Sequence, residues 1–260
     1  MQERYLGDTH DFNKFIFLKF LSNEFKKKIG LNWYLVNTSI LGDKEKKLND
    51  GENRNYLFKK KIIKLDKKLI NELLKFSLRE NRNLVDFTKK THLRKFIKFY
   101  NRTLNRENRQ EWFKESLLFF KNSEIIFLDP DNGLTPKSIK KNSKMSIKYV
   151  LNSELKGINE SGKSVIFCQF QSFSSSHKKM LKEKIQTLKN NIGLNVNCPI
   201  IRNRTAPNTF FITNNNIIKI FNCQFYSLNL VHWHSKTLWF FIVKCFLSAF
   251  LKYYARLCKL

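Results

Sequence analysis

The sequence has little glycine and proline, an odd number of cysteines and few acidic residues. It holds 8 Gly, 4 Pro and 5 Cys in 260 residues. No Cys-x-x-Cys pair occurs, which argues against both a disulfide framework and a zinc knuckle. The cysteines are therefore expected to be buried thiols in a reducing cytoplasm. No G-x-S-x-G motif, Walker A loop or Cys–His nucleophile pattern is present, so an acyl-transferring or nucleoside-triphosphate-using enzyme is not indicated.

Long hydrophobic runs are also missing. In the most apolar segment, residues 237–260, Lys244 interrupts the stretch from Leu238 to Leu251 and leaves it too short for the ~20 residues of a membrane span. We expect residues 236–260 to form a hydrophobic, basic C-terminal helix that is buried or covered by a partner, with an interfacial amphipathic helix as the alternative. The first ten residues are polar and acidic, so we predict no signal peptide and a cytoplasmic location.

The charge balance is strongly one-sided. The chain has 49 Lys and Arg against 21 Asp and Glu, a formal net charge of +28. All 21 acids lie at or before Glu183, and the last 77 residues carry ten basic residues and no acid. Such a field attracts polyanions, so nucleic acid, either RNA or DNA, is the expected partner. The alternative is codon bias from an AT-rich genome, with lysines spread over solvated faces.

Helical and strand patterns alternate, which predicts an α/β fold. Expected helices cover residues 11–28, 66–80, 109–121 and 145–156, and one begins after Ser176. Expected strands cover residues 32–36, 124–128 and 164–170, followed by two more within residues 195–214. This order suggests a parallel sheet that ends in an antiparallel hairpin. Residues 1–235 would form the domain, with a basic helical insert at about residues 66–121.

Two acids follow the apolar run Ile125–Leu128 in the phrase IIFLDPDNGL. In open α/β sheets, ligands bind beyond the carboxyl ends of the strands. We therefore expect Asp129 and Asp131 to be catalytic, with Asn132 and the nearby strand residue Gln169 contacting substrate. The alternative interpretation is structural, because Pro and Asn-Gly favour a turn.

A second dense phrase is RYLGDTHDFNKF at residues 4–15. Asp8 and Asp11 precede an apolar helix and are good caps for it. The phrase holds more charged groups than a cap needs. We therefore expect Asp8, Asp11 and Lys14 to contact substrate, with Lys14 pairing with Asp11 or reaching a phosphate.

With NWYLV, SIKYV and FFIT, these two phrases resemble a family of uncharacterised bacterial proteins. That family carries phrases of the type QDRYVGDxGDFxKY and FLDPDNGLE, and the resemblance extends to about His234. More remotely, the chain is similar to the methyltransferases that modify the N6 of an adenine in large-subunit ribosomal RNA. Gly7, Asp8, Asp11 and Lys14 fall on their G-N-x-A-D-x-x-K-H phrase, and Asp129 and Pro130 fall on D-P-P-Y.

The remote resemblance implies a Rossmann-like, methyltransferase-type sheet. It also implies a site for S-adenosylmethionine, with Gly7 and Asp50 as cofactor-binding residues. Asp129 would hold the amino group of a nucleobase flipped into the pocket. In this sequence Asp131 stands in place of the second proline and Asn132 in place of the aromatic residue. We therefore predict an S-adenosylmethionine-dependent N-methyltransferase or a diverged relative. A non-catalytic nucleic-acid-binding protein on the same scaffold is one alternative.

A rival pattern is that of the metal-dependent nucleases. Pro130 and Asp131, followed by Glu154 and Lys156, match the PD…ExK spacing in which two acids bind Mg²⁺ and the lysine assists water.

The basic stretch at residues 89–113 interleaves Lys and Arg with aromatic residues. It fits an RNA-binding surface, or an amphipathic helix with Leu93, Phe96, Ile97 and Tyr100 facing inward.

Overall fold

The computed structural model describes residues 1–42, 53–170, 175–193, 200–203 and 208–212. Residues Met1–Asn215 form one compact unit. In this described part of the chain, no helix is long and apolar enough to cross a membrane. Asp50 and the C-terminal helix predicted at residues 236–260 lie outside the described residues.

The main sheet has six strands in the order β2-β1-β3-β6-β8-β7. Their bounds are β1 Ile29–Asn32, β2 Ile97–Tyr100, β3 Ile125–Leu128, β6 Ser164–Phe170, β7 Ile200–Asn203 and β8 Asn208–Ile212. Strands β2, β1, β3 and β6 are parallel, and β8 is antiparallel to both β6 and β7. A separate parallel pair joins β4 (Gly133–Leu134) to β5 (Tyr149–Val150). The predicted α/β class with a mostly parallel sheet is confirmed, and it is compatible with a Rossmann-like fold.

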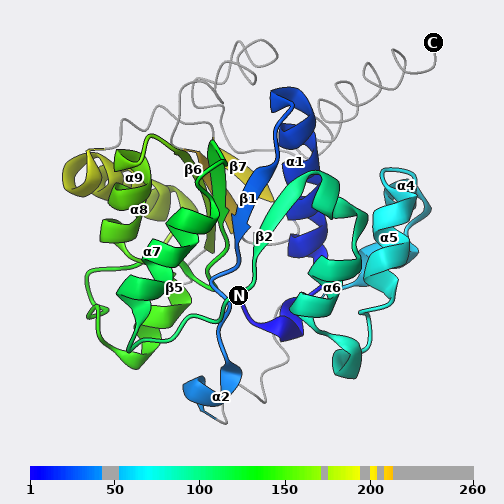
Figure 1. Ribbon diagram of the computed structural model, residues 1–260, viewed down its shortest axis with the longest axis horizontal. Coiled ribbons are helices and arrows are strands. Elements are labelled where there is room, and N and C mark those ends of the chain that lie inside the picture. Colours follow the sequence, from blue (N-terminus) through cyan, green and yellow to red (C-terminus); the bar gives the residue numbers. More distant parts are fainter. Residues whose placement is uncertain (43–52, 171–174, 194–199, 204–207, 213–260) are drawn as a thin grey trace. The chain divides into compact units, whose positions relative to one another are not determined.

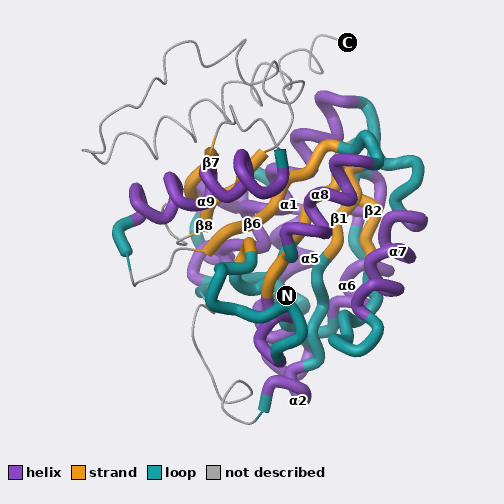
Figure 2. Tube along the Cα trace, turned by 90° about the vertical axis from the view of Figure 1, so that its left-hand side faces the viewer, coloured by secondary structure: helices purple, strands orange, loops and turns teal. Residues whose placement is uncertain are grey.

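Helices cover both faces of the sheet (Figure 1), with α7, α8 and α9 on one face and α1 and α6 on the other. Figure 2 shows α8 and α9 lying across the strands. The helix bounds are α1 Thr9–Phe25, α2 Thr38–Leu41, α4 Lys60–Ile63, α5 Lys67–Leu74, α6 Leu84–Lys90, α7 Arg109–Phe119, α8 Asn152–Glu160 and α9 His177–Ile192. Short 3-10 turns are η1 Glu3–Tyr5, η2 Asn55–Phe58, η3 Arg79–Asn81, η4 His92–Lys95 and η5 Lys144–Lys148.

The chain changes direction across the sheet between β1 and β3. It runs from β1 to β2 on one side of β1 and then returns to β3 on the other side. Asn32 pairs with Leu128 at the ends of the two strands, and Asp129 N donates to Asn32 O at 2.9 Å. The carboxyl ends of β1 and β3 therefore form the topological switch point, where open α/β sheets bind their ligands.

The core lies between this sheet and its helices. Its buried members include Tyr34, Leu104, Trp112, Phe120, Leu128, Leu155, Phe167 and Leu188. Gly30 shows how tightly β1 packs, because a Cβ at this position would lie 2.7 Å from the Phe120 ring. Gly30 was expected to end the first helix. That helix ends at Phe25, and glycine is required at position 30 to admit the Phe120 ring instead.

The prediction of helix through residues 97–100 is wrong. Ile97 and Tyr100 do face inward, as the helical pattern indicated, but they belong to strand β2. A buried–intermediate–intermediate–buried sequence of four residues fits the inner face of either element. The segment expected to be a helical insert therefore contributes a strand to the main sheet, in register with Ile29–Asn32.

Two other predicted boundaries also shift. Strand β1 ends at Asn32, before most of the predicted strand at residues 32–36, and Tyr34 has a positive φ of 49°. The helix predicted at residues 145–156 is divided into a 3-10 turn, β5 and α8. By contrast, β6 covers the predicted residues 164–170, and Ser176 caps α9 by accepting from Lys179 N.

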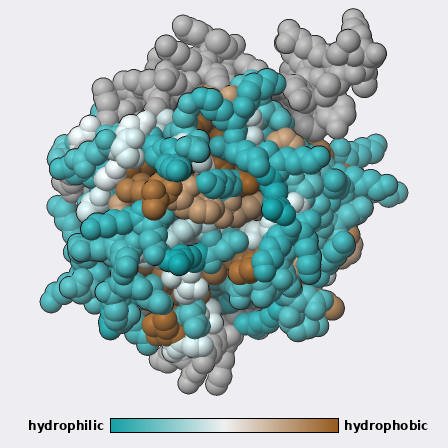
Figure 3. Space-filling model, viewed as in Figure 1, coloured by the Kyte–Doolittle hydropathy of each residue, from teal (hydrophilic) through white to brown (hydrophobic). Residues whose placement is uncertain are grey.

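The face of the molecule seen in Figure 3 is mostly hydrophilic, with scattered hydrophobic patches. Among the described residues, the large hydrophobic side chains with the greatest exposure are Phe58 at 75% and Leu118 at 70%. Isolated apolar residues of this kind are normal on a protein surface.

Candidate functional site

The start of α1 is built around two acidic side chains. Asp8 is the N-cap and accepts from Asp11 N at 2.9 Å, which satisfies a free donor of the first turn. Gly7 has a φ of +76° and donates its N–H to Asp11 Oδ2 at 2.9 Å. Tyr56 OH donates to Gly7 O at 2.8 Å. Both Asp8 and Asp11 are buried, so the capping predicted from the sequence places two carboxylates inside the molecule.

Lys14 joins this helix start to the end of β3. Its Nζ donates to Asp11 Oδ1 at 2.6 Å and to Asp129 Oδ2 at 2.5 Å. Lys14 is 3% exposed and Asp129 is 5% exposed. The two phrases singled out in the sequence therefore meet at the switch point. We call Asp8, Asp11, Lys14 and Asp129 the switch-point cluster.

Burial and charge act in opposite directions in this cluster. Burial raises the pKa of Asp8, and repulsion by Asp11 raises it further. Burial also raises the pKa of Asp129, although the attraction of Lys14 partly opposes this effect. Burial alone would lower the pKa of Lys14, but Asp11 and Asp129 hold it above its ordinary value. Lys14 therefore remains charged, and the acids around it hold protons more readily than free carboxyls do.

Trp33 forms the apolar wall of the cluster. Lys14 Nζ lies 4.6 Å from the centroid of its ring, a cation–π contact. Trp33 is fully buried, and its Nε1 is a donor without a hydrogen-bond partner among the described residues. Phe15 packs edge-on against the same ring.

Asp131 lies beside the cluster and has partners of its own. Its Oδ1 is 3.0 Å from the Met1 amino group, and its Oδ2 accepts from Gln2 Nε2 at 2.7 Å. Burial would raise the pKa of Asp131, but these two partners lower it below its ordinary value. Met1 also donates to Tyr34 O at 2.8 Å and accepts from Val36 N, so the first two residues lie over the switch point.

Asn132 and Gln169 are placed together by a structural network. Gln169 Nε2 donates to Asn132 O at 2.9 Å, and Gln169 Oε1 accepts from Leu134 N at 2.9 Å. Gly133 lies between these contacts with a φ of +99°. The turn predicted from Asn-Gly is thus fixed by Gln169, whose amide is fully engaged with the backbone. Gln169 was predicted to bind substrate, and its described contacts are those of a loop anchor.

Glu154 and Lys156 lie on α8, where the nuclease pattern requires a strand. Glu154 accepts from Arg109 through both oxygens, at 2.6 Å and 2.9 Å, and it also accepts from Tyr34 OH at 3.1 Å. Lys156 points to solvent near Glu160. Among the described residues, no group of three His, Cys, Asp or Glu side chains is placed to hold a metal ion.

A basic cavity of about 510 Å³ lies beside the segments that follow β1 and β2. Leu35 to Thr38 continue from β1, and Asn101 and Thr103 continue from β2. The charged side chains in its lining are Glu3, Arg4, Arg79 and Arg82. Three guanidinium groups therefore line it against one carboxylate, at the carboxyl edge of the sheet.

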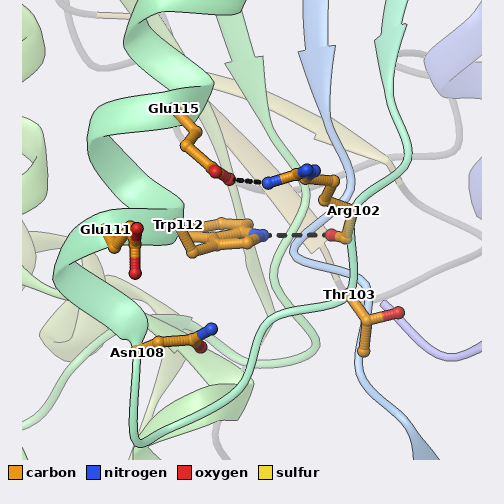
Figure 4. Close-up of a pocket in the computed structure, with 6 residues that line it drawn as sticks. All are labelled: Arg102, Thr103, Asn108, Glu111, Trp112 and Glu115. Carbon is orange, nitrogen blue, oxygen red and sulfur yellow. Dashed lines mark hydrogen bonds and ion pairs between the residues drawn. The ribbon is translucent and has the colours of Figure 1, made fainter.

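A second cavity, of about 400 Å³, lies between α7 and the residues after β2 (Figure 4). Trp112 Nε1 donates to Arg102 O at 3.0 Å, and Arg102 pairs with Glu115. Glu111 and Asn108 line the same space. Thr103 belongs to both cavities, so the segment after β2 separates a basic cavity from one lined by two glutamates.

The structure brings together Asp8, Asp11, Lys14 and Asp129, with Asp131 close by. Neither of the two cavities is lined by any of these residues. Sequence reasoning missed the residues of the basic cavity, because residues 97–100 were interpreted as helix. With β2 in its place, the position of Asn101 just after a strand would have been a signal.

The chain matches no protein-family model, no curated protein and no solved structure.

Proposed function

We propose that this chain is a nucleic-acid-acting enzyme of the methyltransferase type, either an S-adenosylmethionine-dependent N-methyltransferase or a diverged relative. One observation carries the proposal. Lys14 and Asp129 come from the two phrases that resemble such enzymes, and they are in direct contact at the switch point, 115 positions apart in the chain. A chance likeness of two short phrases gives no reason for them to meet.

The sheet supports the same type of scaffold. Strand β8 runs antiparallel between β6 and β7, next to four parallel strands. A parallel sheet with one reversed strand next to its last strand is the arrangement that the resemblance implies. This argument concerns the scaffold, because one fold supports many activities.

Asp129 is the group that would hold the amino group of a nucleobase. Its Oδ2 already accepts from an amino group, the Nζ of Lys14, at 2.5 Å. Burial favours such pairing, because a carboxylate removed from water gains more from a donor than an exposed one does. Lys14 is a positioning residue in this proposal, since it orients the Asp129 carboxylate against the helix start.

The residues after β1 do not fit S-adenosylmethionine in the form that the resemblance implies. Trp33 and Tyr34 follow the strand, both fully buried, where a small-residue turn would admit a nucleoside. Met1 is hydrogen-bonded to Tyr34 and Val36 at the same place. We therefore derive no methyl-transfer step, and the geometry favours the diverged form of the proposal.

The test is a pair of measurements on the full chain. Methyl transfer from radiolabelled S-adenosylmethionine to RNA and DNA is measured, together with the affinity for single strands at several salt concentrations. We expect binding that weakens steeply with salt and decreases further in Asp129→Ala. Asp86→Ala is the matched control, because Asp86 is an exposed acid on α6. Methyl transfer that requires Asp129 would identify the intact enzyme. No binding at low salt, or binding equal in both variants, would refute the proposal.

A further inference from the structure

The basic cavity beside β1 and β2 contains a buried hydrogen-bond acceptor that is not used by the fold. Asn101 Nδ2 donates to Thr88 Oγ1 at 2.7 Å, and Thr88 Oγ1 donates its own hydrogen to Val85 O at 3.0 Å. Thr88 therefore acts as acceptor toward Asn101, which fixes the orientation of the amide. Asn101 Oδ1 is buried without a hydrogen-bond partner among the described residues. An unpaired buried acceptor is costly, and a ligand donor would remove this cost.

The arginines give the same cavity a preference for anions. Arg82 is held by the backbone, donating to Arg4 O at 2.7 Å and to Ser77 O at 2.9 Å. Arg4 donates from Nε to Gln2 Oε1 at 2.9 Å. These contacts fix two of the three guanidinium groups that line the cavity. Fixed arginines bind phosphate well, because their planar N–H groups match two phosphate oxygens at once.

The single carboxylate in the lining does not cancel this charge. Glu3 Oε1 accepts from Leu84 N at 2.9 Å, at the start of α6. It therefore has a structural partner of its own. Three positive groups against one negative group leave an excess of positive charge around a cavity of about 510 Å³. That volume lies within the range of small-molecule sites, about 300–1,000 Å³.

We propose that this cavity binds the ribose-phosphate part of a nucleotide. Arg4, Arg79 and Arg82 hold the phosphate, and Asn101 Oδ1 accepts from a ribose hydroxyl. In Rossmann-like nucleotide sites an acidic acceptor at the sheet edge takes a ribose hydroxyl, and a nearby arginine takes a phosphate on that ribose. A neutral asparagine keeps the acceptor without repelling the phosphate. The site is distinct from the switch-point cluster and does not rest on methyl transfer.

The experiment is calorimetry on the full chain with adenosine, AMP, inorganic phosphate, S-adenosylmethionine and a short 5′-phosphorylated oligoribonucleotide. We expect AMP to bind at least about tenfold more tightly than adenosine, since hydrogen bonds to charged groups contribute about 1.5–3 kcal/mol. The oligoribonucleotide distinguishes the two sources of the ligand. Tighter binding of the strand than of AMP points to nucleic acid, and the reverse points to a free nucleotide.

Two variants locate the binding. Arg79→Gln removes an exposed guanidinium from the lining and is expected to weaken AMP binding about tenfold. Arg94→Gln is the matched control, because Arg94 is an exposed arginine outside the cavity, and it should leave AMP binding unchanged. Asn101→Asp keeps the acceptor but adds a negative charge, so it should weaken AMP binding and leave adenosine binding unchanged.

Four results would overturn the proposal. They are equal affinity for adenosine and AMP, equal affinity for S-adenosylmethionine and AMP, inorganic phosphate binding as tightly as AMP, and equal losses in Arg79→Gln and Arg94→Gln. Melting temperatures of all variants show whether each one is folded. If Asn101→Asp does not fold, the comparison between the two arginine variants still decides. None of these measurements involves Asp129, so a failure here is separable from a failure of the proposed function.

Discussion

Lys14 Nζ lies 2.5 Å from Asp129 Oδ2 and 2.6 Å from Asp11 Oδ1, with all three side chains buried. One positive charge thus stands between two carboxylates inside the protein. The Trp33 ring covers the ammonium group on one side. This arrangement links the first helix to the end of β3 and makes the stability of the fold depend on a single lysine.

Replacing Lys14 by methionine should destabilise the fold by about 3–5 kcal/mol, because it leaves two buried carboxylates without their counter-ion. The loss should be smaller at pH 5 than at pH 8, since protonation relieves the unpaired charge. Urea unfolding at both pH values measures this. Lys19→Met is the control, because Lys19 pairs with Asp66 on the same helix but is partly exposed. A loss of less than about 1 kcal/mol is expected there. Equal losses in the two variants would contradict the prediction.

Glu154→Gln should destabilise the fold by about 3 kcal/mol, because it removes the charge that faces the buried Arg109 guanidinium. Thermal unfolding without added metal is the measurement. Glu160→Gln on the same helix should cost less than about 0.5 kcal/mol, since Glu160 is exposed. A folded Glu154→Gln variant of unchanged stability that has lost Mg²⁺ binding would instead favour the nuclease interpretation.

Gly133→Ala should cost about 2–3 kcal/mol, because alanine is unfavourable there for two reasons. A Cβ at Gly133 would lie 2.5 Å from Gln169 Cδ, and the φ of +99° disfavours any side chain. Gly162 is the matched control, with a φ of +73° and no atom within 4 Å of an added Cβ. Gly162→Ala should therefore cost only the backbone penalty, about 1 kcal/mol. Denaturant midpoints compare the two, and similar costs would show that Gln169 moves aside.

Lys184 gives a prediction about pH. Burial lowers the pKa of Lys184 to about 8, and its Nζ donates to Leu134 O at 2.8 Å. An unfolded lysine has a pKa of about 10.4, so between about pH 8 and 10.4 the unfolded chain binds more protons than the folded one. Stability from this group therefore rises with pH across that window. The stability of the wild type relative to Lys184→Met should increase between pH 8 and 10. A constant difference in urea unfolding would refute this.

The sequence predicted the elements whose pattern is local. Strand β6 needs seven consecutive residues of high strand propensity, and α9 needs a serine cap and an apolar stripe, so both are visible in the chain itself. The phrases around Asp8 and Asp129 also stood out by their composition. Residues 97–100 failed because four residues are too few to separate a helix period from a strand period, and sheet pairing with β1 decided the outcome.

By itself, the amino-acid sequence determined the α/β class, the basic character and the two acid-bearing phrases. Only the tertiary structure decided what these acids face. Lys14 neutralises Asp129, Arg109 engages Glu154, and Gln169 holds the turn at Gly133, and each of these contacts joins residues at least 35 positions apart. Partners at such distances are set by strand order and helix packing, which local sequence patterns do not encode. The basic cavity has the same origin, because Arg4, Arg79 and Asn101 meet only when the chain is folded.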